Sequence, residues 1–348
     1  MLRLLAYLVV LGVSSAAALT GWLWWQLSGP LALAEPRVLD VANGEGLGHV
    51  ARRLQVEGVL ADYRPLLIYS RATGLGRQLQ AGEYAIAPGT TPLALLALLE
   101  AKRTISYQVT LVEGWTVQQA LTALHAQPKL SRRLDSPQQA DFWAVLGVET
   151  PLASHPEGLF FPDTYQYQKG MSDADVLLQA YTRLDRVLAE EWSARSTGLP
   201  YDTPYAALIM ASVVEKETAV PAERGQIAGV FVRRLQRGMR LQTDPTVIYG
   251  LGQAFDGNLR RRHLQDAGNR YNSYRHAGLP PTPIALAGRA AIRAALHPEE
   301  GSSLYFVARG DGSHQFSRTL AEHQAAVERY QRQRRADYRS SPDREARP

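Results

Sequence analysis

The stretch YDTPYAALIMASVVEKETAV, residues 201–220, predicts a buried helix that ends in charged residues. Asp202 or Thr203 can cap this helix, and Pro204 suits its first turn. The residues that follow, up to Val214, are almost all apolar, and the run EKE then closes the helix. A helix that is apolar over most of its length is a core helix, so its charged last turn needs an explanation.

The last turn carries two carboxylates that we expect in different surroundings. At about 100° per residue, one apolar face is formed by Ile209, Met210, Val213 and Val214. Glu217 falls near the middle of that face, whereas Glu215 points nearly the opposite way, beside Ser212. Burial and the negative end of the helix dipole both raise the pKa of a carboxyl, and a general acid must keep its proton near neutral pH. Plain solvated surface for Glu217, and pairing of Glu215 with a basic residue, are the alternatives.

The first segment predicts a membrane anchor. No charged residue occurs from Leu4 to Leu27, and a bilayer core needs about 20 apolar residues. Trp22, Trp24 and Trp25 lie at the far end, where an aromatic belt is expected. A cleaved signal peptide is the alternative, with small residues at 14–18 for cleavage. We favour the uncleaved anchor because the apolar run continues past that point.

Charge and composition narrow the function classes. Arg3 precedes the apolar span and Glu35 follows it, so the positive-inside rule places the bulk of the chain outside the cytoplasm. The 38 basic residues are spread beside 33 acidic ones, which argues against nucleic-acid binding. There is no Cys, and the eight His are scattered without ligand spacing, so we predict neither a metal site nor a cofactor.

The 348 residues fit about two domains behind the anchor. We predict an α+β protein with an N-terminal transmembrane helix, a small α/β module and a larger catalytic domain of mixed helices and strands. The expected boundaries are 1–28 for the cytoplasmic N-terminus and anchor, 29–36 for a linker, 37–104 for the module, 105–330 for the catalytic domain and 331–348 for a disordered tail. The elements expected within them are strands at 38–41, 81–88, 107–111 and 303–309, and helices near 50–57, from 92, from 116, across 171–235, at 288–296 and from 320.

Three other stretches combine aromatic residues with short polar ones. They are EGLFFPDTYQY at 157–167, RLQTDPTVIYGLG at 240–252 and YNSYRHAGLPPTPI at 271–284. Aromatic faces stack on sugar rings, while Asn, Gln, Asp and Thr bond hydroxyl and acetamido groups. Turn chemistry with aromatics at the edge of a core is the alternative for each stretch. No HExxH, GxSxG, Walker or GxGxxG motif is present, so chemistry must come from carboxylates and hydroxyls.

Together these motifs resemble those of the YceG-like family of endolytic murein transglycosylases. The resemblance covers roughly residues 107–324 and rests on EGLFFPDTY, MASVVEKETAV, RLQRGMRLQTDPTVIYGLG, YNSY, GLPPTPIA, AALHP and LYFVARGDGSHQFSRTLAEH, in the family's order. It implies a protein of the inner membrane, anchored by residues 4–27, whose catalytic domain faces the cell wall. It also implies that residues 37–104 are a LysM-like glycan-binding unit, although the Gly-rich, basic run at 38–54 departs from a typical one.

The resemblance implies that the catalytic acid is Glu217 of the EKET motif, with Glu215 as the alternative. The acid would cut the bond between N-acetylmuramic acid and N-acetylglucosamine within glycan strands and leave a 1,6-anhydro end without using water. The substrate-binding candidates are Gln242, Thr243, Asp244, Tyr271, Asn272, Tyr274, Glu157, Phe161 and Asp163. Implied partners are peptidoglycan strands and peptidoglycan synthases, and termination of a growing strand is a plausible task.

Two other functions fit parts of the same sequence. A membrane-anchored peptidoglycan-binding scaffold would use the anchor and the aromatics, but it gives no reason for an acid on an apolar helix face. A hydrolytic muramidase would use Asp244 or Glu157 as a second carboxylate. Its product would carry a reducing end, so the mass of the product separates the two enzymes.

Overall fold

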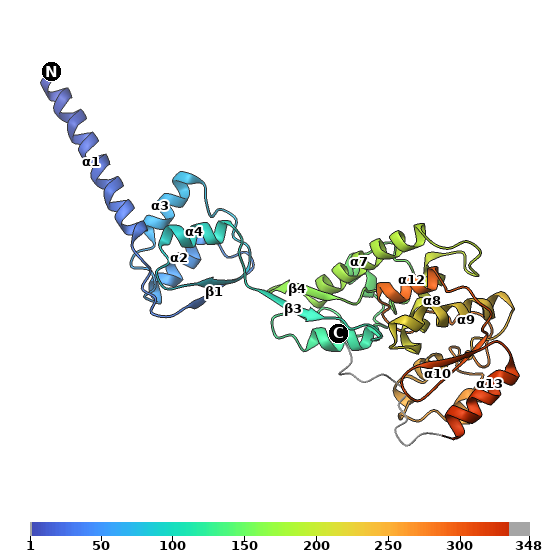
Figure 1. Cartoon of the computed structure of the whole chain (residues 1–348). Coiled ribbons are helices and arrows are strands. Elements are labelled where there is room, and N and C mark those ends of the chain that lie inside the picture. The colour runs from blue at the N-terminus through green and yellow to red at the C-terminus, as the bar shows by residue number, and fades with distance from the viewer. Residues whose placement is uncertain (1, 334–348) are drawn as a thin grey trace. The chain divides into compact units, whose positions relative to one another are not determined.

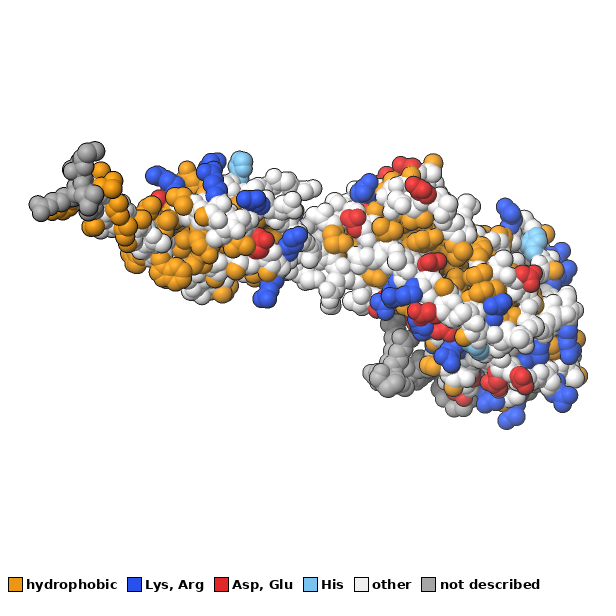
Figure 2. Space-filling view, turned by 90° about the horizontal axis from the view of Figure 1, so that it is seen from above, with side chains coloured by type: hydrophobic (Ala, Val, Ile, Leu, Met, Phe, Trp, Pro, Cys, Tyr) orange, Lys and Arg blue, Asp and Glu red, His pale blue; other side chains and the backbone are white. Residues whose placement is uncertain are grey.

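A single long helix, α1 (Leu2–Ser28), begins the chain (Figure 1). Its residues Tyr7–Ser28 form a span of 22 residues, and the most apolar 18-residue window of this span is not buried in the protein. Figure 2 shows the orange apolar side chains along it. By length and composition α1 can cross a bilayer, which is consistent with the predicted anchor.

The computed structural model describes residues 2–333 and divides them into two units. The first unit runs to Tyr107 and includes Lys129–Ser131 and Gln166–Met171, and the second holds the rest. After α1, the elements of the first unit are β1 (Arg37–Val41), α2 (Leu47–Val56), α3 (Arg64–Thr73), β2 (Gly82–Ile86) and α4 (Pro92–Glu100). Strands β3 (Ser106–Thr110) and β4 (Thr164–Gln168) then form a two-stranded sheet.

The core of the first unit forms between one small sheet and three helices. Strands β1 and β2 are antiparallel, with Leu39 opposite Tyr84 and Val41 opposite Gly82. Leu39, Val41 and Tyr84 turn inward and pack against α2, α3 and α4. Leu27, from the last turn of α1, is buried in the same core. The end of α1 is therefore a structural part of the first unit.

The predicted strands at 38–41 and 81–88 and the helix from residue 92 are confirmed in this unit. Thr91 caps α4 by accepting a hydrogen bond from the Ala94 N–H at 3.1 Å. Helix α3 was not predicted. Its sequence signals are Pro65 in the first turn and Gly74 at its end, which has a φ of +79° that favours glycine.

Helices dominate the second unit. Its elements are α5 (Val117–His125), α6 (Phe142–Leu146), α7 (Asp173–Ser193), α8 (Pro204–Glu217), η1 (Pro221–Glu223), α9 (Arg224–Gln236), α10 (Asp244–Leu251), η2 (Gly252–Ala254), α11 (Arg261–Gln265), α12 (Arg289–Leu296), β5 (Tyr305–Ala308), β6 (His314–Ser317), α13 (Leu320–Val327) and η3 (Glu328–Arg332). The mixed helix and strand content of the prediction is confirmed. Within the stretch RLQTDPTVIYGLG, residues Asp244–Leu251 form the helix α10.

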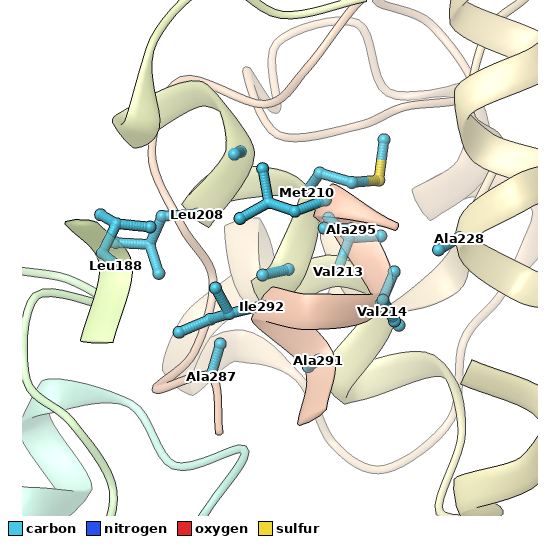
Figure 3. Packing of buried hydrophobic residues seen from close by; sticks show 14 of the residues in the cluster. Leu188, Leu208, Met210, Val213, Val214, Ala228, Ala287, Ala291, Ile292 and Ala295 are labelled. Carbon is cyan, nitrogen blue, oxygen red and sulfur yellow. The ribbon is translucent and has the colours of Figure 1, made fainter. Parts of the chain in front are cut away.

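Helix α8 lies at the centre of the second unit. It packs against α7, α9, α10 and α12. Figure 3 shows Val213 and Val214 of α8 beside Ile292 and Ala295 of α12. The small side chains of α12 let the two helices approach closely, as neighbouring ribbons in Figure 1 show. Because helices surround it, α8 is held firmly up to its last turn.

The four apolar residues predicted on one face of α8 are buried, but burial is not confined to that face. Every residue from Ala207 to Val214 is buried, including Ser212, whose hydroxyl donates to the Ile209 carbonyl and accepts from the Ile284 N–H. Helical periodicity cannot separate a core face from a solvent face when neighbours cover the whole helix. The first and last turns of α8 are less buried, and in the last turn the hydrogen-bond and ion-pair partners distinguish the two carboxylates.

The chain ends its described part with a hairpin and a helix. Strands β5 and β6 are antiparallel, with Phe306 opposite Phe316. Phe306 also meets Phe231 of α9 edge to face at 5.7 Å, which attaches the hairpin to the core. Thr319 caps α13, as the expected final helix requires. Of the predicted disordered tail, residues 334–348 lie outside the described residues.

Candidate active site

Glu217 is the last residue of α8, at the point where the helix leaves the core. Thr203 starts the helix by accepting a hydrogen bond from the Ala206 N–H, and Pro204 occupies its first turn, as predicted. Thr218 leaves the helix in an extended conformation. The rigid packing of α8 therefore fixes the position from which the Glu217 carboxyl projects.

The Glu217 carboxyl is held by Thr243. The Thr243 hydroxyl donates to Glu217 Oε2 at 2.5 Å. Burial raises the pKa of Glu217 to about 7; the Thr243 hydrogen bond and Arg234 oppose this rise, and the charge of Asp244 adds to it. About half of such carboxyls carry a proton at neutral pH, so Glu217 can donate a proton and afterwards accept one.

Thr243 is itself held by two buried hydroxyl groups. It is 2% exposed, and its N–H donates to Ser273 Oγ at 3.0 Å. Its carbonyl accepts hydrogen bonds from Thr246 Oγ1 at 2.8 Å and from Ser273 Oγ at 3.3 Å. The loops that end at residues 243 and 274 are therefore joined directly behind Glu217.

Asp244 and Tyr274 lie on the solvent side of these joined loops. The Tyr274 hydroxyl donates to Asp244 Oδ1 at 2.7 Å. Burial and the charge of Asp244 raise the pKa of Tyr274, so the phenol keeps its proton. Asp244 is exposed and begins α10, where a negative charge suits the helix dipole.

Gln242 adopts a left-handed backbone conformation, with a φ of +54°. Such a conformation costs a non-glycine residue about 1–3 kcal/mol and persists only when neighbours impose it. Its N–H donates to the Ser273 carbonyl at 3.2 Å, and its side-chain oxygen accepts from Arg234 at 3.2 Å. The strain sits next to Thr243, so the conformation of this turn sets how Glu217 is held.

Glu157 is a second carboxyl with a raised pKa. It is 4% exposed, and burial raises its pKa to about 7. One oxygen accepts from the Val117 N–H at 3.0 Å, at the start of α5, and the other accepts from the Tyr249 hydroxyl at 3.1 Å. Tyr249 meets Tyr271 edge to face at 4.7 Å. Glu157 therefore links the start of α5 to Tyr249 of α10, which in turn contacts Tyr271.

Glu215 has the partners of a structural residue. Its side chain is 5% exposed, and it forms an ion pair with Arg224 at 3.4 Å. It also accepts from the Gly288 N–H at 3.0 Å, immediately before α12. Burial and the nearby Glu113 raise its pKa, and Arg224 opposes that rise. Pairing with a basic residue was the alternative expected for Glu215, and it is confirmed.

The other predicted binding residues fall into two groups. Asn272 is fully buried, and its amide donates to the carbonyls of His263, Leu264 and Asp266, so it shapes the loop. Asp163 pairs with Arg183 of α7, whose guanidinium also lies over the Phe161 ring at 5.3 Å. The contacts of Phe161 and Asp163 therefore lie at α7, away from Thr243.

Sequence reasoning missed three residues of this site: Arg234, Thr246 and Ser273. Ser273 lies inside YNSY and Thr246 inside TDPT, so their small hydroxyls stood between residues that had been selected. The signal for Arg234 is the pair of basic residues, Arg233 and Arg234, that follows the run GVFV on α9. Among residues 2–333, no three His, Asp or Glu side chains gather in a way that could hold a metal ion.

Comparison with family models matches residues 39–329 to the YceG-like family. This chain belongs to the YceG-like family. The match includes Glu217, the loops at 242–244 and 271–274, and Glu157. The family resemblance predicted from the motifs is therefore confirmed, and it extends further toward the N-terminus than those motifs.

Named relatives of this YceG-like chain occur in two genera. An endolytic murein transglycosylase of Bacillus subtilis is 30% identical over 306 residues, which is 84% of each chain. An endolytic murein transglycosylase of Streptococcus pneumoniae is 31% identical over 164 residues, which is 44% of this chain and 28% of that protein. The named relatives are thus lytic transglycosylases, and the first aligns along most of its length.

A solved structure of similar fold comes from the same family. A yceG-like protein from Listeria monocytogenes is 26% identical, with a TM-score of 0.54. The alignment covers 84% of this chain and 99% of that one. The arrangement of elements described for this YceG-like chain therefore has an experimental counterpart.

Proposed function

We propose that this YceG-like protein is an endolytic lytic transglycosylase that cleaves the bond between N-acetylmuramic acid and N-acetylglucosamine within peptidoglycan strands. Its Bacillus subtilis relative is named endolytic murein transglycosylase. The observation that carries the proposal is a carboxyl at the end of α8, Glu217, with a pKa of about 7 and with exposed polar neighbours in Gln242 and Asp244. A binding scaffold would not require a carboxyl that keeps its proton near neutral pH next to exposed polar side chains.

In the first step, the protonated Glu217 gives its proton to the oxygen that bridges the two sugars. The bond from that oxygen to C1 of N-acetylmuramic acid breaks, and positive charge develops at C1 and the ring oxygen. The Glu217 carboxylate left behind accepts the Thr243 hydrogen bond, which is stronger to a charged acceptor. Thr243 therefore stabilises the acid after it has lost its proton.

In the second step, the Glu217 carboxylate takes the proton of the C6 hydroxyl of the same muramic acid. The hydroxyl oxygen then bonds to C1 and closes a 1,6-anhydro ring. The nucleophile belongs to the substrate, so the reaction needs no second carboxylate and consumes no water. Glu217 ends protonated, as it began, and can act again.

General acid-base catalysis contributes about 10²–10⁴ to the rate, so positioning must supply much of the rest. Gln242, Asp244 and Tyr274 are partly or fully exposed beside Glu217, and we assign them to direct contact with the glycan. We assign Tyr271 and Asn272 to support of this surface, because Tyr271 packs against Tyr249 and Asn272 binds backbone carbonyls.

Hydrolysis by a muramidase is the competing reaction. Both oxygens of Glu157 already accept hydrogen bonds from protein donors, which leaves it poorly placed to activate water. Asp244 is exposed and is the stronger candidate for a second carboxylate. Hydrolysis adds one water to the product, so the product distinguishes the two reactions.

We also propose that α1 is an uncleaved, single-pass anchor in the inner membrane, with the remaining chain on the extracytoplasmic side. Arg3 before the span and Glu35 after it support this orientation. Leu27 and Leu31 are buried in the core of the first unit, so the helix end contributes to its packing. A protein held at the membrane in this way would meet strands as they are made.

For residues 37–104 we propose a LysM-like, glycan-binding role, supported by the helices and small sheet of the first unit. Termination of strand elongation, with peptidoglycan synthases as partners, follows from an endolytic enzyme held at the membrane. Recovery of a synthase with the full-length protein from detergent supports the partnership, and its consistent absence contradicts it.

The test of the reaction is mass spectrometry of purified peptidoglycan digested by the full-length protein in detergent. Wild type and Glu215→Gln should both release products with 1,6-anhydro ends, because Glu215 has a structural role and joins the end of α8 to the start of α12. Glu217→Gln should release none while keeping its circular dichroism spectrum. Reducing-end products from wild type would show hydrolysis, and intact strands from every protein would favour the scaffold.

A further inference from the structure

Arg234, in the last turn of α9, is a buried charge without an acidic partner. It is 7% exposed. Its Nε donates to the Leu304 carbonyl at 2.7 Å, and its Nη1 donates to the carbonyls of Arg240 and Leu241 and to the side-chain oxygen of Gln242. These acceptors are all uncharged. No ion pair to Arg234 occurs among residues 2–333.

A buried guanidinium without a counter-charge is costly, because hydrogen bonds to neutral groups replace only part of its hydration. Its neighbour on the helix makes the contrast clear. Arg233 donates to the carbonyls of Ser303 and Glu299, both at 2.9 Å, at the rim of the same helix. Attachment of the hairpin to α9 therefore does not by itself require a second, fully buried arginine.

The far side of Arg234 supplies no negative charge. Its guanidinium lies over the Tyr305 ring at 5.0 Å, and the Tyr305 ring also stacks with the His323 ring at a centroid distance of 5.2 Å. Burial and the charge of Arg234 lower the pKa of His323, which keeps the imidazole neutral. The stack holds the guanidinium in place and leaves its charge uncompensated.

The near side of Arg234 leads to the catalytic carboxyl. Its acceptors at residues 240–242 directly precede Thr243, whose hydroxyl binds Glu217. They include Gln242, whose left-handed backbone must be imposed by its neighbours. The charge of Arg234 acts on Glu217 without touching it, and lowers the pKa of that carboxyl.

We propose that Arg234 is a positioning residue of the cleavage reaction: it fixes the turn that brings Thr243 to Glu217, and its charge balances the Glu217 carboxylate that exists between the two proton transfers. The inference rests on the proposed function. In the reactive form, with Glu217 protonated, the guanidinium has no counter-charge, and one forms when Glu217 gives up its proton. The attraction between Arg234 and the Glu217 carboxylate thereby offsets part of the free energy lost by burying the guanidinium, at the stage when the carboxylate forms.

The charged and titratable groups around Glu217 act in both directions. Asp244 of α10 raises the pKa of Glu217, and Arg234 of α9 lowers it. Tyr274 lies between the loops as a neutral phenol, with its own pKa raised by burial and by the charges of Asp244 and Glu217. Loss of Arg234 would leave Asp244 unopposed, so Glu217 would hold its proton more tightly.

The experiment measures kcat and KM against pH for the full-length protein in detergent, with isolated glycan strands as the substrate. Arg234→Met removes the charge, and Arg234→Gln is a second neutral variant in case the first fails to fold. We expect a fall in kcat of about 10–100-fold and a shift of the alkaline limb of kcat/KM to higher pH by about half a unit. Arg234→Lys keeps the charge, so the alkaline limb of its kcat/KM profile should stay at the pH of wild type. Its kcat should still fall, because Lys cannot make all the hydrogen bonds that hold the turn at residues 240–242.

Arg233→Met is the matched control, because it removes carbonyl-bonding groups from the same helix without facing the turn. Its kcat/KM should have an alkaline limb at the same pH as that of wild type. An unmoved limb in both neutral variants overturns the electrostatic role, and an equal shift in Arg234→Lys shows that packing causes it. Activity in Glu217→Gln would instead refute the proposed reaction, whatever Arg234 does.

Discussion

Glu157 and Glu217 have the same raised pKa but differ in their access to solvent. Burial brings the pKa of both carboxyls to about 7. Glu157 is 4% exposed, and its two oxygens accept hydrogen bonds from Val117 and Tyr249. A ligand would have to displace protein donors to reach it.

Glu217 is partly exposed, and only its Oε2 has a hydrogen-bond donor, Thr243, among residues 2–333. Exposed Gln242 and Asp244 lie beside it. The comparison teaches that a raised pKa marks burial, which structural and catalytic groups share. The two sites differ in that one oxygen of Glu217 has no protein donor among residues 2–333, next to exposed polar side chains that we propose contact the glycan.

Replacement of both acids is the strongest test of this comparison. Glu217→Gln should lower the cleavage rate by about 10²–10⁴-fold, because the proton donor is lost. Glu157→Gln should keep the rate within about tenfold, since the Gln oxygen can accept from the Val117 N–H and its NH2 group can donate to the Tyr249 hydroxyl. Release of soluble muropeptides over time measures both rates. Equal losses in the two variants would contradict the distinction between them.

Removal of the Thr243 hydroxyl tests the one hydrogen bond that holds Glu217. Thr243→Val should lower kcat by about tenfold or more, because hydrogen bonds to charged groups contribute about 1.5–3 kcal/mol. That bond favours the carboxylate, so its loss raises the pKa of Glu217 and moves the alkaline limb of the rate profile to higher pH. Thr203→Val, at the opposite end of α8, should leave the limb in place. A limb that moves equally in both variants would refute the specific role of Thr243.

Thermal unfolding at several pH values tests the structural role of Glu157. Its pKa in the folded protein is above the ordinary 4.5, so folding favours its protonated form. Stability should therefore fall as the pH rises from about 4.5 to about 7, where the buried carboxyl must ionise. In Glu157→Gln the melting temperature should fall less over that range than in wild type. The same fall in both proteins would mean that Glu157 is not protonated when folded.

The smallest effect is expected at Asp244. Its negative charge raises the pKa of Glu217, so Asp244→Asn should move the alkaline limb to lower pH by about half a unit. The direction is opposite to that of Thr243→Val. Asp256→Asn removes a charge from an exposed ion pair with Arg260 and should leave the limb unchanged. A shift of the alkaline limb to higher pH in Asp244→Asn would contradict the claim that the charge of Asp244 raises the pKa of Glu217.

Local sequence signals were sufficient to predict the frame of the site. Thr203 and Pro204 marked the start of α8, and its apolar composition marked it as a core helix. The loops at 242–244 and 271–274 were selected for their polar and aromatic residues, and both lie at the end of α8. These features depend on neighbours in the sequence, where periodicity and capping are informative.

The orientation of individual side chains could not be predicted in the same way. Asn272 was expected to face a ligand, yet its amide donates to three backbone carbonyls, those of His263 and Leu264 in α11 and of Asp266 just after it. Arg234 had no recognised role because its acceptors lie on another segment. Such assignments depend on tertiary contacts, which no single stretch of sequence contains.

Glu217 was selected because it falls on the apolar face predicted for α8, but burial in the folded helix is not limited to one face. Every side of α8 is covered from Ala207 to Val214, so periodicity carried no information there. The choice of Glu217 over Glu215 rests instead on partners. Glu215 is tied to Arg224 and the Gly288 N–H, and Glu217 to a hydroxyl beside open surface.

The most direct test is the pH dependence of kcat/KM for wild type and Glu157→Gln, measured on glycan strands with the full-length protein. This quantity reports the acids of the free enzyme. If Glu217 is the proton donor, both proteins should lose activity above an apparent pKa near 7, at the same pH. An alkaline limb that moves or disappears in Glu157→Gln would contradict the account and assign the proton to Glu157.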